Sequence, residues 1–278
     1  MKRLLVCSEP DIPSLNMRDC LMEIQDWDEV GCSNGARMLR HGDTYMLSSQ
    51  RWHVDFEDVL DVSGEFGVDP EMVIFMSRHS SESGRPALTV HPIGNYHGNE
   101  LGGRPRKLVS SSPGYMTDAL RRISKLNDMD GTQVTFEVTH HGPWLDRPAF
   151  FIEVGSDISH WENKHAAYIL AHVLATNKGG ENPAVVGVGG GHYAPRFTEA
   201  ALSLKADFGH MIPNYQIDDR DDEDIARILR EACVATATKS VFLHRKSMKG
   251  TQATRIKDLA ASEGLEVVSS SDFEPLDQ

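Results

Sequence analysis

The chain has few cysteines and no long apolar run, and both absences exclude classes of protein. Its 278 residues include four cysteines, and none of them forms a CxxC pair. The sequence therefore supports neither a disulfide scaffold nor a thiolate zinc site. No segment approaches the roughly 18 apolar residues of a membrane span, and the apolar run near the N-terminus is too short for a signal peptide. We expect a cytoplasmic protein that has no membrane span, and no obligate protein partner is evident.

Lysine is also scarce, whereas aspartate is abundant. Acidic side chains outnumber basic ones by 41 to 28, which gives a formal net charge of −13. Aspartate exceeds glutamate by 23 to 18, and arginine exceeds lysine by 18 to 10. A strongly hydrated anionic surface of this kind keeps a protein soluble at high salt. We interpret the composition as halophilic, with an ordinary acidic cytosolic protein as the alternative.

Two stretches of the chain depart from this acidity. Residues 72–125 sum to +5, and residues 236–257 carry six basic side chains and no acidic one. A polyanionic partner is the simplest reason to keep carboxylates out of both stretches. Chance fluctuation over blocks of this length is the alternative. The candidate polyanion-binding side chains are Arg104, Arg106, Lys107, Arg245, Lys246 and Lys249.

Apolar runs of strand length alternate with helical patterns along the chain. The predicted strands are Arg3–Cys7, Met72–Ser77, Leu88–His91, Val134–His140, Phe150–Val154, Ala184–Val188, Val241–His244 and Leu265–Val268. The predicted helices are Ser14–Ile24, Ser159–Thr176, Phe197–Leu204, Asp221–Ala235 and Thr251–Ala261. This alternation predicts an α/β fold, with a mixed sheet flanked by helices, in a single domain over residues 1–278. We expect a hairpin over Gly131–Val154, and residues 30–50 are too irregular to assign.

Histidines gather in the middle of the chain, where ten of the thirteen lie between residues 79 and 210. Many follow predicted strands, which is where α/β proteins place ligands and catalytic groups. Imidazole suits both proton transfer near neutrality and zinc binding. His140 and His141 are adjacent, so on an extended strand they would point to opposite faces unless the strand breaks at Gly142. Each histidine has a purely structural hydrogen-bonding role as its alternative.

Two further features accompany the histidines. Glu153 is a single carboxylate within the otherwise apolar predicted strand Phe150–Val154. A carboxylate buried there requires a partner, which is a metal, an imidazole or the cation of a plain salt bridge. Gly189, Gly190 and Gly191 follow a buried strand and precede His192 and a helix beginning near Arg196. Successive glycines allow backbone N–H groups to cradle an anion, although a tight turn is the alternative. No serine-hydrolase elbow, HExxH or deaminase zinc motif is present.

Six ordered segments together resemble the archaeal-type D-aminoacyl-tRNA deacylases, which are also found in plants. They are SRHSSESGRPALTVHPIGN (77–95), HGNELGG (97–103), THHGP (139–143), FIEVGS (151–156), GVGGGHYAPRFT (187–198) and FGHMIPNY (208–215). The resemblance runs through most of the chain, and the excess acids lie mainly between the segments, as we expect of a haloarchaeal member. It implies a zinc-dependent enzyme with a fold similar to phosphorylases and peptidyl-tRNA hydrolase. Such an enzyme hydrolyses the ester between a D-amino acid and tRNA, which is chiral proofreading of translation.

Combined with this resemblance, the residues receive candidate roles. The candidate catalytic residues are His140, His141, Glu153 and His192. The candidate zinc ligands are His79, His91, His141, His192 and His210. The candidate anion- and substrate-binding residues are Asn95, His97, Gly189, Gly190, Gly191 and Arg196. The two basic stretches would hold the phosphates of tRNA. The alternatives are a peptidyl-tRNA- or nucleoside-type hydrolase and a non-catalytic RNA- or metal-binding module.

Overall fold

The computed structural model describes residues 1–276 and contains two principal sheets. The larger sheet has the order β2 (Asp28–Ser33), β3 (Ala36–His41), β4 (Thr44–Ser49), β1 (Arg3–Ser8), β5 (Met72–Arg78), β10 (Ala149–Gly155), β6 (Ala87–Pro92) and β9 (Gln133–Phe136). The smaller sheet has the order β12 (Asp207–Ile212), β11 (Ala184–Val188), β13 (Ser240–Leu243) and β14 (Glu266–Val268). Parallel and antiparallel pairs occur together, so the predicted mixed α/β architecture is confirmed.

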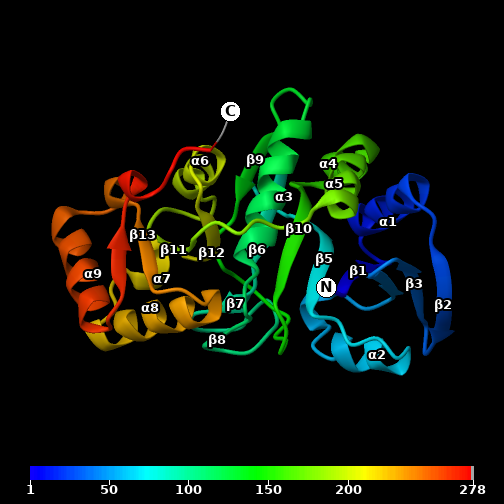
Figure 1. The fold of residues 1–278 in the computed structure, drawn as a ribbon, viewed down its shortest axis with the longest axis horizontal. Coiled ribbons are helices and arrows are strands. Elements are labelled where there is room, and N and C mark those ends of the chain that lie inside the picture. Colours follow the sequence, from blue (N-terminus) through cyan, green and yellow to red (C-terminus); the bar gives the residue numbers. More distant parts are fainter. Residues whose placement is uncertain (277–278) are drawn as a thin grey trace.

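Helices cover both sheets, and Figure 1 shows them above and below the strands, in front of the centre, and at the left end of the molecule. They are α1 (Ile12–Ile24), α2 (Val59–Glu65), α3 (Pro113–Leu126), α4 (Ile158–Trp161), α5 (Lys164–Thr176), α6 (Pro195–Ser203), α7 (Asn214–Ile217), α8 (Asp222–Thr236) and α9 (Gly250–Ser262). A short strand pair, β7 (Gly94–Asn95) and β8 (Lys107–Leu108), closes a loop beside the centre of the molecule. Short 3₁₀ turns are η1 (His53–Asp55), η2 (Arg245–Ser247) and η3 (Ser270–Asp272). Within residues 1–276 we find no helix with the length and apolarity that crossing a bilayer requires.

The cores follow from alternation along the buried strands. In β5, Ile74 and Met76 pack into a core with α1, α3 and α5, whereas Val73 and Phe75 pack into a second core with α2. Successive side chains of a strand point to opposite faces, so one continuous apolar run serves both cores. The first core also contains Phe208 and Phe242 of the smaller sheet. Apolar packing therefore continues from one sheet to the other.

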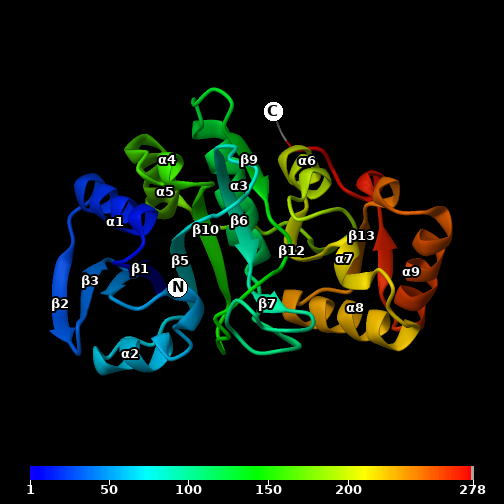
Figure 2. The same cartoon turned by 180° about the vertical axis from the view of Figure 1, so that it is seen from behind.

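Three sequence-based expectations about local structure are wrong. The Gly131–Val154 hairpin does not form, because β6 lies between β9 and β10 and pairs with both (Figure 2). The strand expected to reach His140 ends at Phe136. The helix expected over Ser159–Thr176 is broken into α4 and α5, because Asn163 caps a new helix by accepting from the amides of residues 165 and 166. Residues 30–50, left unassigned above, form antiparallel β2, β3 and β4.

Arg121 joins the two halves of the fold at the back of the first core. From α3 it donates to the backbone oxygens of Ala201, Leu204 and Ala206, and it pairs with Asp207 of β12 at 3.1 Å. The Asp207 side chain is buried, so its charge requires this partner. Arg121 belongs to the basic stretch 72–125, yet its role is structural.

Candidate active site

Glu153 and His91 lie side by side because of the register between β10 and β6. Phe151 is opposite His91 and Glu153 is opposite Thr89 in this antiparallel pair. The alternate residues Ile152 and Val90 enter the first core, so Glu153 and His91 share the other face of the sheet. Nε2 of His91 is 3.7 Å from a Glu153 oxygen. The buried carboxylate that the sequence singled out thus has an imidazole beside it.

A second buried carboxylate, Glu137, stands where the two sheets meet. Just beyond β9, the amide of Val138 donates to the backbone oxygen of His192, and the amide of Ala194 donates to that of Phe136. These bonds align residues 136–138 with residues 192–194 as neighbouring strands. They bring Nε2 of His192 within 2.8 Å of a Glu137 oxygen, and the Glu137 side chain has no exposed surface.

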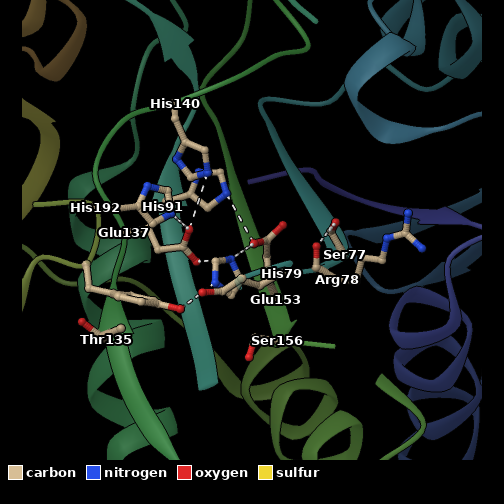
Figure 3. Close-up of polar contacts among 12 residues, drawn as sticks. Ser77, Arg78, His79, His91, Thr135, Glu137, His140, Glu153, Ser156 and His192 are labelled. Atoms are coloured by element: carbon tan, nitrogen blue, oxygen red, sulfur yellow. Dashed lines mark hydrogen bonds and ion pairs between the residues drawn. The ribbon is translucent and has the colours of Figure 1, made fainter. Parts of the chain in front are cut away.

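His79 lies between the two carboxylates (Figure 3). Its Nδ1 is 3.0 Å from Glu137 and 3.7 Å from Glu153, and its Nε2 is 2.8 Å from the hydroxyl of Tyr193. Burial disfavours charge on the imidazole, but hydrogen bonds and attraction from the two carboxylates dominate and raise the pKa of His79 to about 11. Without a metal, His79 is therefore a cation that neutralises a buried anionic pair.

His91, His140 and His141 form a second group on the other side of Glu153. Their Nδ1 atoms lie 2.8 to 3.1 Å from the backbone oxygens of Pro92, Val138 and Gly142. A protonated Nδ1 that donates to these oxygens leaves Nε2 of His140 and of His141 with a lone pair. In His91, burial opposes the charge, but hydrogen bonding and attraction from Glu153 raise the pKa, which favours a proton on its Nε2. Burial lowers the pKa values of His140 and His141, and that of His141 falls to about 4, so both rings are neutral.

The backbone is not extended through the adjacent histidines, because it turns at His141, and such a break is the condition under which they could act together. His141 has a positive φ of 43°, and the ring centroids of His140 and His141 are 4.3 Å apart. The turn is fixed from outside, because Gly94 donates to the backbone oxygen of His141 and Gly142 donates to that of Leu101. Both rings therefore lie in one cluster with His91 instead of on opposite faces of a sheet.

The donor atoms of these side chains suit a transition metal. His91, His140 and His141 offer three ligand atoms within 4.8 Å of one another, and His79, Glu137 and His192 do the same. Nε2 of His91 is buried and has no hydrogen-bond partner within residues 1–276. The first group fits a metal better, because two of its three imidazoles, His140 and His141, are neutral, whereas Glu137 already pairs with both histidines of the second group.

A cavity of about 490 Å³ opens onto both groups. The residues around it include Asn95, His97, His140, His141, His192 and Tyr215. Three of the four predicted catalytic residues and two of the predicted substrate-binding residues thus border one space. Asn95 also donates to the backbone oxygen of Gly102, and Nε2 of His97 is 3.0 Å from that of Gln216, so both hold the cavity wall in place.

The predicted glycine nest is already occupied by the protein. The amide of Gly189 donates to Ile212, and the amide of Gly190 donates to the hydroxyl of Ser247. The sequence suggested that these N–H groups bind an anion together with that of Gly191. Two of the three already donate to the protein, so the predicted anion-binding nest does not form. Arg196 does not point into this nest either, because its guanidinium pairs with Glu199 and donates to the hydroxyl of Ser270.

His210 is not a metal ligand in this arrangement, and Glu137 is a site residue that the sequence reasoning missed. Nδ1 of His210 is 3.0 Å from Thr139, and Nε2 is 2.8 Å from the backbone oxygen of Val109, so the protein engages both nitrogens. Glu137 carried the same signal as Glu153, a single acid in an apolar strand. That rule would have found Glu137 had it been applied to residues 133–138.

Some basic side chains of the two basic stretches are paired with carboxylates in the structure, so fewer of them are available to a polyanion than the sequence indicates. Arg104 pairs with Glu57 at 3.2 Å and stacks over Trp144, and Arg255 pairs with Asp222 at 2.6 Å. Arg106 and Lys107 lie at or beside β8, and Arg245 and Lys246 form η2, next to Lys249. These last five side chains make no ion pair within 4.0 Å among the residues described.

Histidines that are oriented by buried carboxylates and border a cavity can activate water, which is the chemistry that a hydrolase requires. Residues 66–268 match the family model of D-aminoacyl-tRNA deacylase. A D-aminoacyl-tRNA deacylase of Methanosarcina acetivorans is 34% identical over 98% of this chain and 93% of its own length. That of Thermococcus kodakarensis is 33% identical over 96% and 99%. The chain therefore belongs to the D-aminoacyl-tRNA deacylase family, which is a family of hydrolases.

Other comparisons concern length and fold. The chain spans 58% of the length of a D-aminoacyl-tRNA deacylase from Methanococcoides burtonii, to which it is 33% identical. A crystal structure titled a conserved protein of unknown function superposes with a TM-score of 0.89 at 28% identity and covers 99% of both chains. A uridine phosphorylase from Schistosoma mansoni aligns over 63% of the chain with a TM-score of 0.42 and 9% identity. Nothing about the chemistry of this chain follows from that distant alignment.

Glu137→Gln tests the electrostatics of the cluster in metal-free protein. The pKa of His79 is raised from 6.5 to about 11, so its stabilisation is complete below about pH 6.5, declines by about 1.4 kcal/mol per pH unit above that, and is lost once the pH passes about 11. Without the charge of Glu137 the pKa of His79 falls, so the stabilisation is smaller and its decline ends at a lower pH. We expect the free energy of unfolding in urea at pH 7 to drop by about 3–5 kcal/mol in Glu137→Gln, and its decline with rising pH to level off at a lower pH than in wild type.

Glu199→Gln is the matched control, because Glu199 is exposed and its ion pair with Arg196 lies outside the cluster. It should change the free energy of unfolding by less than about 1 kcal/mol. Parallel pH profiles for the wild type and Glu137→Gln would show that Glu137 does not hold the charge of His79.

Proposed function

We propose that this chain hydrolyses the ester that joins a D-amino acid to the 3′-terminal ribose of tRNA. Its membership of the D-aminoacyl-tRNA deacylase family supports the substrate, and the cavity supports the chemistry. The observation that carries the proposal is the pairing of His192, which borders the cavity, with the buried Glu137 at 2.8 Å. A histidine oriented by a carboxylate is a suitable general base for activating water.

The proton path uses the two nitrogens of His192. Nε2–H donates to Glu137, which fixes the tautomer and leaves Nδ1 to accept a proton from water. Glu137 stabilises the imidazolium that results, as the buried carboxylate of a catalytic triad does. The water oxygen attacks the ester carbonyl, and the same imidazolium then returns its proton to the departing ribose oxygen. His79 holds Glu137 in place throughout.

The neighbouring group of three histidines fits zinc, which we propose as the cofactor. His91, His140 and His141 would hold it through Nε2, since His140 and His141 are neutral and the Nδ1 atoms of all three rings are fixed by backbone oxygens. Bound zinc supplies Lewis acidity, which polarises a carbonyl and lowers the pKa of water toward about 7. Glu153, beside His91, contributes negative charge next to a cationic centre.

We propose that tRNA phosphates bind along unpaired cations outside the cavity. Arg245 and Lys246 border a groove of about 690 Å³ between α6, β13 and η3, together with Arg196. Lys249 follows on the same segment, while Arg106 and Lys107 lie in the loop beside the cavity, next to Arg104. Contacts of this kind read the RNA backbone and its shape more than its base sequence, which suits an enzyme acting on many tRNAs.

The setting of the protein follows from the same proposal. A tRNA substrate places the enzyme in the cytoplasm, where its cysteines stay reduced. The 41 acidic side chains and the scarcity of lysine support a halophilic, haloarchaeal source. The relatives described above come from methanogens and a Thermococcus, so composition alone carries this part. At high salt, phosphate contacts weaken, and shape and base contacts must supply more of the affinity.

His192→Ala tests the general-base proposal. Loss of the imidazole should lower kcat for D-tyrosyl-tRNA by about 10²–10⁴-fold, because water then lacks a proton acceptor. The measurement is deacylation of the labelled substrate under saturating conditions. His172→Ala, which removes a partly buried histidine of α5 far from the carboxylate cluster, is the control and should keep wild-type turnover. A His192→Ala enzyme within about threefold of wild-type kcat would contradict the role of His192.

Zinc binding is tested without reference to activity. After dialysis against a chelator, wild-type protein should rebind zinc in equilibrium dialysis, with metal content measured by mass spectrometry. We expect His140→Ala to weaken zinc binding at least tenfold, since a ligand is lost from the group of three. His165→Ala, an exposed histidine of α5, should bind zinc as wild type does. Equal zinc affinity in wild type and His140→Ala would refute the proposed ligand set.

A further inference from the structure

Two large apolar side chains are exposed at the otherwise polar cavity. Leu101 is 64% exposed and Tyr215 is 49% exposed, and both border the cavity together with His140, His141 and His192. Exposed apolar surface beside a catalytic group commonly marks a binding position for an apolar part of a ligand. Tyr215 is the aromatic one of the two, so it offers a flat face to that ligand.

The ring of Tyr215 is presented from a fixed turn. On one side, the amide of Asn214 donates to Gly190, and its side chain donates to the backbone oxygen of Ser247. On the other side, the backbone oxygen of Gln216 lies 3.0 Å from His97. Binding at a pre-positioned ring costs little conformational entropy. The Tyr215 hydroxyl makes no hydrogen bond within residues 1–276, so no polar contact of the hydroxyl with the described residues accounts for the position of the ring.

The phenol also stays neutral under physiological conditions. Burial, with a smaller contribution from the negative charge of Glu137, raises the pKa of Tyr215 to about 12. Tyr215 borders the same cavity as His140, His141 and His192. A group stacked on Tyr215 is therefore held near the proposed reacting centre.

We propose that Tyr215 is the stacking platform for the adenine of the 3′-terminal nucleotide of tRNA. This inference rests on the proposed function, because it is the ester position that places the nucleotide in the cavity. The scissile ester is on the terminal ribose, so bringing its carbonyl to His192 brings the attached base into the same space. Every base has a π face, and stacking on an aromatic side chain is how proteins hold unpaired nucleotides. The stack fixes the ribose and hence the ester.

Charge considerations favour this kind of contact in the present chain. Phosphate contacts lose affinity steeply as salt increases, whereas stacking does not depend on charge. A protein that carries −13 overall gains specificity for an RNA end through a neutral contact. The cavity volume of about 490 Å³ lies within the range of sites that enclose a ligand of nucleoside size.

A double-mutant cycle between protein and RNA tests the proposal by binding alone. The probes are two fluorescent RNA minihelices, one ending in CCA and one shortened to CC, titrated with wild-type protein and with Tyr215→Ala. For wild type we expect removal of the terminal adenosine to weaken binding about tenfold. For Tyr215→Ala the two RNAs should bind within about twofold of each other, because the partner of the adenine is gone.

Three further variants make the result specific. Tyr215→Phe should retain the tenfold preference, since stacking uses the ring and not the hydroxyl. Tyr168→Ala should retain it too, because Tyr168 is 46% exposed on α5 but does not border the cavity. Tyr215→Leu, apolar without an aromatic face, should lose the preference and serves as the second variant if Tyr215→Ala unfolds, as judged by circular dichroism.

The possible outcomes separate this proposal from the proposed function. A tenfold preference that survives Tyr215→Ala and Tyr215→Leu would overturn the stacking role, as would a wild type that binds both RNAs equally. The latter result would assign the ring to another part of the substrate, such as the amino-acid side chain. Wild-type protein that prefers CCA but leaves D-tyrosyl-tRNA intact would contradict the proposed function and support stacking.

Discussion

Two buried carboxylates, Glu137 and Glu153, impose the constraint on which the site depends. Neither can stay ionised inside the protein without counter-charges and hydrogen-bond donors. His79 lies between them, His192 completes the shell of Glu137, and His91 completes that of Glu153. Histidines that would be mobile on the surface are thereby held in fixed tautomers and orientations. The electrostatic cost of burying the acids is offset by the same contacts that prepare the site for hydrolysis.

The site lies where the two sheets meet, so folding and function share their contacts. The backbone around Glu137 bonds to residues 192–194, and Thr139 bonds to Met211 of β12. Any shift of the smaller sheet would move His192 away from Glu137. The turn that brings His141 beside His140 also depends on β7 and on the loop before β8, because Gly94 of β7 donates to His141 and Gly142 donates to Leu101 of that loop. The proposed catalytic geometry is thus distributed over segments far apart in sequence, which are close only in the complete fold.

Much of this could be predicted from local pattern, and the failures have one physical cause. Continuous apolar runs located most strands of the buried sheets, and the buried Glu153 followed from a single acid among apolar neighbours. Whether His140 and His141 come together depends on a backbone turn at His141. That turn is held by Gly94 and Leu101, which lie about 40 residues earlier in the chain. The glycine nest failed for the same reason, since Ser247 takes the amide of Gly190. Local sequence shows which groups could bind, and long-range packing decides which remain free.

The central claim is that this histidine–carboxylate site hydrolyses D-aminoacyl esters of tRNA and spares the L-forms. The most direct measurement compares deacylation of D-tyrosyl-tRNA and L-tyrosyl-tRNA by the wild-type protein, side by side in molar KCl. The account predicts that the D-substrate is hydrolysed well above its spontaneous rate while the L-substrate stays near its own. Equal rates on both substrates, or no acceleration of either, would contradict it.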